Sequence, residues 1–328
     1  MHPIIKNYPG VMEVIIATTV MALLGLLGLY IAPLFFLIML LLPLPLVYLI
    51  LKRDLLYALL AVVLTLFMLM FTFANIKSAG LLVFQFAPLG ILIGLMLKNN
   101  VTVDKSMAVL FFWALLIAAL NLLFSFMLSG AGISQVTEEF RATMDQMAQI
   151  YNQNGLLDES DRQQYLALTE QIVNLVQTFL PGSVAVWNIM LTMSTYFIAR
   201  YWMRSLGFTI PNNFHFTQWR LPWYSIWLII IGLALTLGGD ELSWQLMEVI
   251  GKNILYIAAF IFFVLGMAII LHFIQLWRVS KVVKIIIMLV MLLYLPFTAM
   301  VALTIGIIDP VVNIRRQPGE DGDGNKGG

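Results

Sequence analysis

The residues of this sequence that could recognise a ligand are polar and aromatic side chains inside long apolar runs. They are Gln85, Asn121, Ser125, Trp187 and Asn188. In an apolar environment an amide or hydroxyl hydrogen-bonds a ligand or a neighbouring helix, and an indole ring supplies an apolar wall. We therefore treat the five as candidate substrate-binding residues. The alternative is interhelical hydrogen bonding, which contributes about 0.6 kcal/mol per bond.

The runs that carry these residues have the length and composition of membrane spans. The 328 residues are 61% hydrophobic and 11% charged, with a mean hydropathy of +0.95. Soluble domains are about one quarter charged, and about twenty apolar residues in a helix cross a hydrocarbon core of about 30 Å. The sequence predicts an all-α polytopic transmembrane bundle.

About nine spans are predicted, or eight if one run does not cross. The runs are 14–30, 35–51, 55–73, 81–97, 106–128, 183–203, 223–237, 252–277 and 285–308. Pro43 and Pro45 must kink the second run or keep its first half non-helical, and Pro296 interrupts the ninth. The first span is expected to be uncleaved.

Residues 129–181 are polar, with seven acids against two arginines and a balance of −5. Apolar residues recur there at helical spacing on either side of Asn154 and Gly155, which predicts an external hairpin of two amphipathic helices. Three roles for the hairpin are compatible with the sequence: it covers the membrane face of the bundle, it acts as a lid over a pocket, or it docks another protein. The predicted organisation is spans one to five in 1–128, the hairpin in 129–181, the sixth span in 182–205, three further spans in 206–310 and a disordered tail in 311–328.

Basic residues in the short loops set the orientation. If every run crosses, they share one side: Lys52, Arg53, Lys98, Lys105, Arg200, Arg204, Arg220, Arg278, Lys281 and Lys284. That side is predicted to be the cytoplasm, so the N-terminus is cytoplasmic and residues 129–181 lie outside. Nine crossings then place Arg315 and Arg316 outside, against the rule, which leaves the side of the C-terminus open.

Small residues three or four apart provide faces for close helix packing or for docking a partner. They are Thr18, Ala22 and Gly25 in the first span and Gly90 and Gly94 in the fourth. Packing within one chain is the commoner use of such faces.

Several function classes lack the residues they need. The sequence has no cysteine, three dispersed histidines and no GxxxxGK[ST], GxSxG or HExxH motif, so we predict no metal, no cofactor, no ATPase and no enzyme activity. Acids lie at span ends, which disfavours coupling to protons or sodium. A net charge of +1 with scattered basic residues argues against nucleic acid.

Four runs carry a resemblance to the YybS-like family of uncharacterised bacterial membrane proteins, over nearly the whole chain. They are PLPLVYLILKRD at Pro43–Asp54, APLGILIGLMLKN at Ala87–Asn99, QWRLPWYSIW at Gln218–Trp227 and IGIIDP at Ile305–Pro310. The first six spans also resemble the substrate-binding S component of energy-coupling factor vitamin transporters. That likeness implies that Thr18 and Ala22 meet a membrane coupling partner, although the hairpin and the three extra spans depart from it.

Together these features favour a protein of the bacterial cytoplasmic membrane that binds or transports a small molecule without its own ATPase. The ligand would enter from outside between spans four to six, and a partner protein in the bilayer would supply energy. The alternative is a membrane scaffold for envelope or division machinery that uses the hairpin as its contact surface.

Overall fold

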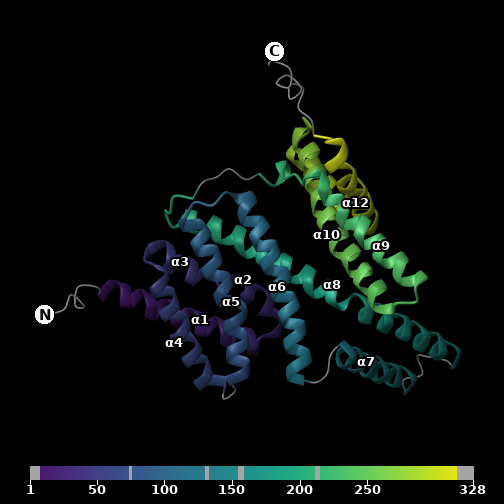
Figure 1. The fold of residues 1–328 in the computed structure, drawn as a ribbon, viewed down its shortest axis with the longest axis horizontal. Coiled ribbons are helices and arrows are strands. Elements are labelled where there is room, and N and C mark those ends of the chain that lie inside the picture. Colours follow the sequence, from purple (N-terminus) through teal and green to yellow (C-terminus); the bar gives the residue numbers. More distant parts are fainter. Residues whose placement is uncertain (1–7, 74–75, 130–132, 154–158, 211–214, 316–328) are drawn as a thin grey trace, which may run out of the picture. The chain divides into compact units, whose positions relative to one another are not determined.

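The chain forms two compact units of helices (Figure 1). The computed structural model describes residues 8–73, 76–129, 133–153, 159–210 and 215–315, and these contain helices and turns but no strand. One unit comprises residues 1–120 and 187–213, and the other 121–186 and 214–328. Nine stretches of the described residues are long and apolar enough to cross a membrane, so the predicted all-α polytopic fold is confirmed.

The first unit is built mainly from six helices: α1 (Tyr8–Tyr30), α2 (Phe35–Leu41), α3 (Leu44–Lys52), α4 (Leu55–Phe73), α5 (Ile76–Lys98) and α6 (Val103–Ser129). A 3-10 turn, η2 (Ala32–Leu34), joins α1 to α2. The second predicted run is thus kinked at Pro43, which precedes α3. Both halves of this run are helical, so the predicted alternative of a non-helical first half is wrong.

Small residues bring α1 and α4 together. The Thr18 hydroxyl donates to the carbonyl oxygen of Ala61 (3.4 Å), and Gly25 packs against Leu69 further along both helices. Residues that rise in number along α1 therefore meet residues that rise along α4, and the two helices are parallel. This is the arrangement expected if each of the first four predicted runs crosses once.

Two glycines of α5 bring that helix close to α3. A Cβ atom at Gly90 would lie 2.9 Å from the carbonyl oxygen of Pro43, and one at Gly94 would lie 2.8 Å from Cδ1 of Ile50. The absence of these Cβ atoms lets the two helices approach closely and in parallel.

Ion pairs gather at one end of this unit. Glu13 binds Arg53 (2.7 Å) and Lys52 (2.9 Å), and Lys98 binds Asp54 (2.6 Å) and the carbonyl oxygen of Arg53 (2.9 Å). The hydrogen bond to Glu13 raises the pKa of Arg53 above its ordinary value. Basic residues that were predicted to share one side of the membrane thus meet at one end of the helices.

The predicted helical hairpin is present in the second unit, between α7 (Ile133–Gln153) and the first part of α8 (Glu159–Ser205). Arg141 pairs with Glu170 (2.9 Å), and the Tyr165 hydroxyl donates to the Met144 carbonyl oxygen (3.3 Å). The second arm of the hairpin and the predicted sixth span belong to one helix, α8, whose 47 residues continue through Pro181. The predicted domain boundary at 181 stays a prediction.

A side-chain amide explains why α8 continues. Proline lacks an N–H group and normally breaks or kinks a helix. Here Asn253 donates to the carbonyl oxygen of Thr178 (2.8 Å) and accepts from the N–H of Gly182 (2.6 Å). One amide from a distant helix therefore binds two backbone groups of the turn that contains Pro181.

The rest of the second unit contains η3 (Phe216–Gln218), η4 (Trp223–Ile226), α9 (Trp227–Glu241), α10 (Gln245–Leu276), α11 (Lys281–Leu293) and α12 (Leu295–Val312). Gly232 packs against Leu255 and Gly239 against Glu248, so α9 and α10 are antiparallel. The predicted ninth span, 285–308, is expected to be interrupted at Pro296, and it is interrupted two residues earlier. The chain bends at Tyr294, where φ is −101° and ψ is 42°, and this divides the run between α11 and α12.

The end of α12 returns to the end of the unit where α9 begins. Arg315 donates to the carbonyl oxygens of Thr217 (2.9 Å) and Trp219 (2.8 Å), just before η4 and α9. Because α10 is antiparallel to α9, α10 also finishes at this end (Figure 1). The path through α11 and α12 therefore leaves this end and comes back to it, which places Arg315 beside the basic Arg220.

This path predicts which side of the membrane each turn faces. The sequence has no cysteine, so Ser280→Cys, Ile314→Cys and Ser243→Cys each add a single thiol. We expect an impermeant maleimide to label the first two variants from the same side and Ser243→Cys, in the turn between α9 and α10, from the other. Labelling of Ile314→Cys from the side that labels Ser243→Cys would contradict the path.

The closest helix contact gives a second prediction. A Cβ atom at Gly266 would overlap the carbonyl oxygen of Ala302, whereas one at Gly238 would meet only the flexible end of Met247. We expect Gly266→Ala to lower the free energy of unfolding in detergent by about 1–3 kcal/mol, because overpacking forces the helices apart. Gly238→Ala is the matched control and should change it little, and equal losses would contradict the contact.

Candidate functional site

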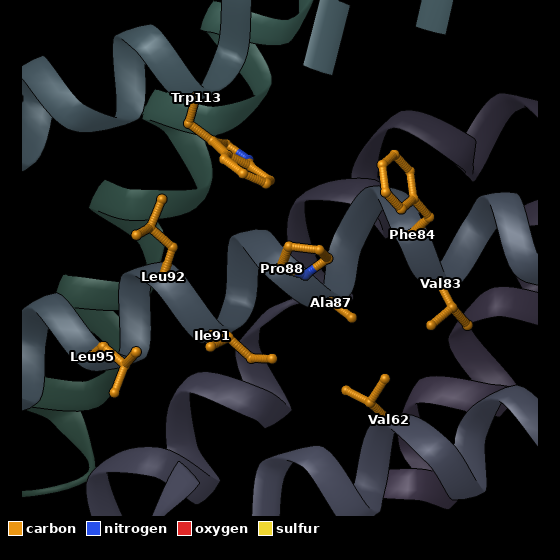
Figure 2. Close-up of a pocket in the computed structure, with 9 residues that line it drawn as sticks. All are labelled: Val62, Val83, Phe84, Ala87, Pro88, Ile91, Leu92, Leu95 and Trp113. Carbon is orange, nitrogen blue, oxygen red and sulfur yellow. The ribbon is translucent and has the colours of Figure 1, made fainter. Parts of the chain in front are cut away.

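An open groove with apolar walls lies in the first unit, between α4, α5 and α6 (Figure 2). Its volume is about 410 Å³. In Figure 2 Phe84 and Trp113 lie on one side and Val62 on the other, with Ala87 and Pro88 between them. The complete lining is Val62, Val83, Phe84, Ala87, Pro88, Ile91, Leu92, Leu95 and Trp113. Apart from the indole N–H of Trp113, these side chains are hydrocarbon, so the groove suits a hydrocarbon chain.

The groove exists because α5 has two different faces. Gly90 and Gly94 hold one face against α3. Phe84, Leu92 and Leu95 lie on another face, roughly a third of a turn away at 3.6 residues per turn. Pro88 lies on that second face and removes a backbone hydrogen bond from the helix, which favours a bend there.

The candidate ligand residues lie elsewhere. Gln85 is half-buried on α5 but does not line the groove, although its neighbour Phe84 does. Trp187 packs its ring on Phe36 with centroids 4.9 Å apart, and Asn188 is buried.

The other two residues of that set lie on α6. Asn121 is half-buried and belongs to the second unit, and the side chain of Ser125 lies outside the described residues. The five remain a prediction as a set. The spacing of Phe84, Pro88, Leu92 and Leu95 was the sequence signal for the groove, but without the positions of α4 and α6 it resembles any lipid-facing stripe.

The candidate packing residues are used inside the first unit. Thr18 and Ala22 are buried, and Gly25 faces Leu69 of α4 and Leu82 of α5. Gly90 and Gly94 face α3, as described above. Helices of the same unit therefore fill these faces.

A buried ion pair lies at the C-terminal end of α12, and it is the most buried pair among the described residues. Arg315 binds Asp309 at 2.8 Å, and their side chains are 2% and 3% exposed. The same guanidinium donates to the backbone of Thr217 and Trp219, and Asp309 accepts from the N–H of Ile314 (3.1 Å). The carboxylate therefore neutralises the buried guanidinium, whose Nε has no hydrogen-bond partner among the described residues, and the cluster stabilises the packing of α12.

The fold and the groove define a polytopic helical membrane protein. Residues 19–310 match a family described as "Predicted membrane protein (DUF2232)", and the chain belongs to that family. It is also similar to the "Uncharacterized protein YybS" of Bacillus subtilis (strain 168), with 23% identity over 201 residues. The alignment covers 60% of this chain and 59% of that protein. The predicted resemblance to the YybS-like family is confirmed.

No solved structure matches the chain significantly. The likeness of the first six spans to transporter S components is not shown by these matches, and it stays a hypothesis.

The four runs that carried the resemblance meet in two pairs. Pro43–Asp54 packs along Ala87–Asn99 through Gly90 and Gly94, and the pair ends at the bond between Lys98 and Asp54. In the second unit, Trp219 and Ile226 of one run pack in the same apolar cluster as Ile305 and Ile307 of the other. Each run thus contributes to one of two helix contacts within the units.

The buried ion pair gives a prediction about stability. Arg315→Met leaves the Asp309 carboxylate buried without its cation, so we expect the free energy of unfolding in detergent to fall by about 3–5 kcal/mol. The double variant Arg315→Met/Asp309→Leu should recover part of that loss. Arg278→Met, at an exposed arginine, is the control. A loss no larger than that of the control would show that the pair is not buried.

Proposed function

We propose that this integral membrane protein binds a molecule with a long hydrocarbon chain, taken from the bilayer into the groove of the first unit. The observation that carries the proposal is the groove itself, whose walls come from three membrane-spanning helices. From Val83 to Leu95 it follows α5 for about 18 Å at 1.5 Å per residue, which matches an extended chain better than a compact polar solute.

The apolar lining of the groove limits the class of ligand that the protein could transport. An apolar groove has few donors or acceptors to fix a vitamin-like polar ligand, and such sites need a few placed polar groups. A hydrocarbon chain needs none. The protein would present or hand on such a lipid, and since the sequence has no phosphate-binding loop, energy for any transport would come from a partner in the membrane. No catalytic step is part of this proposal.

The orientation proposed is that of the bacterial cytoplasmic membrane, with the N-terminus in the cytoplasm and residues 129–181 outside. It is supported by the basic residues at the ends of α3 and α5, Lys52, Arg53 and Lys98, which meet at one end of the first unit. Basic loops favour the cytoplasmic side.

A scaffold is the second candidate, and the hairpin favours it. Apolar side chains on α7 and on the first part of α8 are exposed in place of being packed between the two helices: Met147, Ile150, Leu168, Ile172 and Leu175. Exposed apolar surface of this kind typically contacts protein or membrane. A partner protein would dock here, in the hairpin, and not on the filled small-residue faces.

Native mass spectrometry of the gently extracted protein tests the first candidate. We expect a bound lipid, and we expect Val62→Trp, which fills the groove, to lower the bound fraction at least fivefold. Val63→Trp is the matched control, because the neighbouring Val63 is 49% exposed and does not line the groove. Gln85→Leu should leave the lipid bound.

Two results would overturn this proposal. If Gln85→Leu abolishes binding and Val62→Trp does not, the ligand site is the amide set of the sequence analysis. If a protein partner is retained and no lipid is bound, the scaffold is favoured.

A further inference from the structure

We propose that the lipid held in the groove is an anionic phospholipid, with its phosphate at the end of α5 and the start of α6. This inference rests on the proposed function and adds the charge of the ligand. The polar group of a chain lipid must leave the hydrocarbon region at one end of the groove, so the question is which end offers it cations.

Lysines mark the end of the groove nearest Leu95. Leu95 lies three residues before Lys98, a rise of about 4.5 Å along α5. α5 ends at Lys98 and α6 begins at Val103, so Lys105 in the first turns of α6 is at the same end. Lys105 is exposed, and Lys98 is held in place by Asp54 and by the carbonyl oxygen of Arg53.

The start of α6 adds further groups that favour an anion. The first turn of a helix carries N–H groups without helical acceptors and a partial positive charge. The Ser106 hydroxyl is fully buried and has no hydrogen-bond partner among the described residues. Ser106 lies seven residues before Trp113, nearly two turns, and therefore on the same face of α6 as that wall of the groove.

Basic side chains only slightly outnumber acidic ones at this end of the groove. Lys52 and Arg53 are engaged by Glu13, and Lys98 is shared with Asp54. Lys105 is exposed to solvent and could meet an anionic ligand, whereas Asp104 beside it is also exposed and would oppose one. These two exposed neighbours make the ligand's charge testable without disturbing the packed helices.

The experiment reconstitutes the full chain in nanodiscs of phosphatidylcholine with a minor fraction of phosphatidylglycerol, then measures retained lipids by native mass spectrometry. We expect phosphatidylglycerol to be enriched in the protein-bound fraction. Lys105→Gln should reduce that enrichment about fivefold, since a lysine near an anionic headgroup contributes about 1 kcal/mol. Asp104→Asn should increase it.

Lys281→Gln is the control for general attraction of anionic lipids, because Lys281 is an exposed lysine at the start of α11. An equal loss in Lys281→Gln and Lys105→Gln would overturn the assigned phosphate position. Retention of phosphatidylcholine and phosphatidylglycerol in the proportion in which the nanodisc contains them, with loss of both in Val62→Trp, would overturn this inference and leave the proposed function standing. Retention unaffected by Val62→Trp would remove the groove and both proposals with it.

Discussion

Close approach of helix backbones at glycine is the contact on which the rest of this structure depends. A bilayer supplies no hydrophobic force between helices, so association depends on van der Waals packing and on hydrogen bonds. Gly90 and Gly94 allow α3 to reach α5, and Gly266 and Gly306 allow α12 to reach α10. Because one face of α5 is fixed in this way, the face that carries Pro88 is left to form the groove.

The features that the sequence predicted are those written in local spacing. Apolar runs, the amphipathic pair between 133 and 180 and the small-residue faces all follow from residues within a few turns of one another. The continuity of α8 does not, because it depends on Asn253, more than seventy residues from Gly182. The path of α12 likewise depends on Arg315 reaching the backbone of Trp219. The groove depends on where Val62 of α4 and Trp113 of α6 lie relative to α5.

The same distinction separates the amide side chains from the groove. Amides inside spans stand out in a sequence, and Gln85 and Asn188 therefore suggested a polar pocket. A groove for a hydrocarbon chain has no distinctive residue types, since it is made from leucine, valine and aromatic side chains that any span contains. Its position beside Lys98 and the start of α6 gives it a polar end, which a lipid requires and a purely structural crevice does not.

The most direct test of the account is photo-crosslinking with a phospholipid that carries a diazirine in its acyl chain, followed by peptide mapping of the reconstituted protein. We expect label to concentrate on α5 between Val83 and Leu95 and on α6 near Trp113, and excess unlabelled phospholipid to compete for it. Label spread evenly over the lipid-facing helices, with no concentration on these segments, would contradict it.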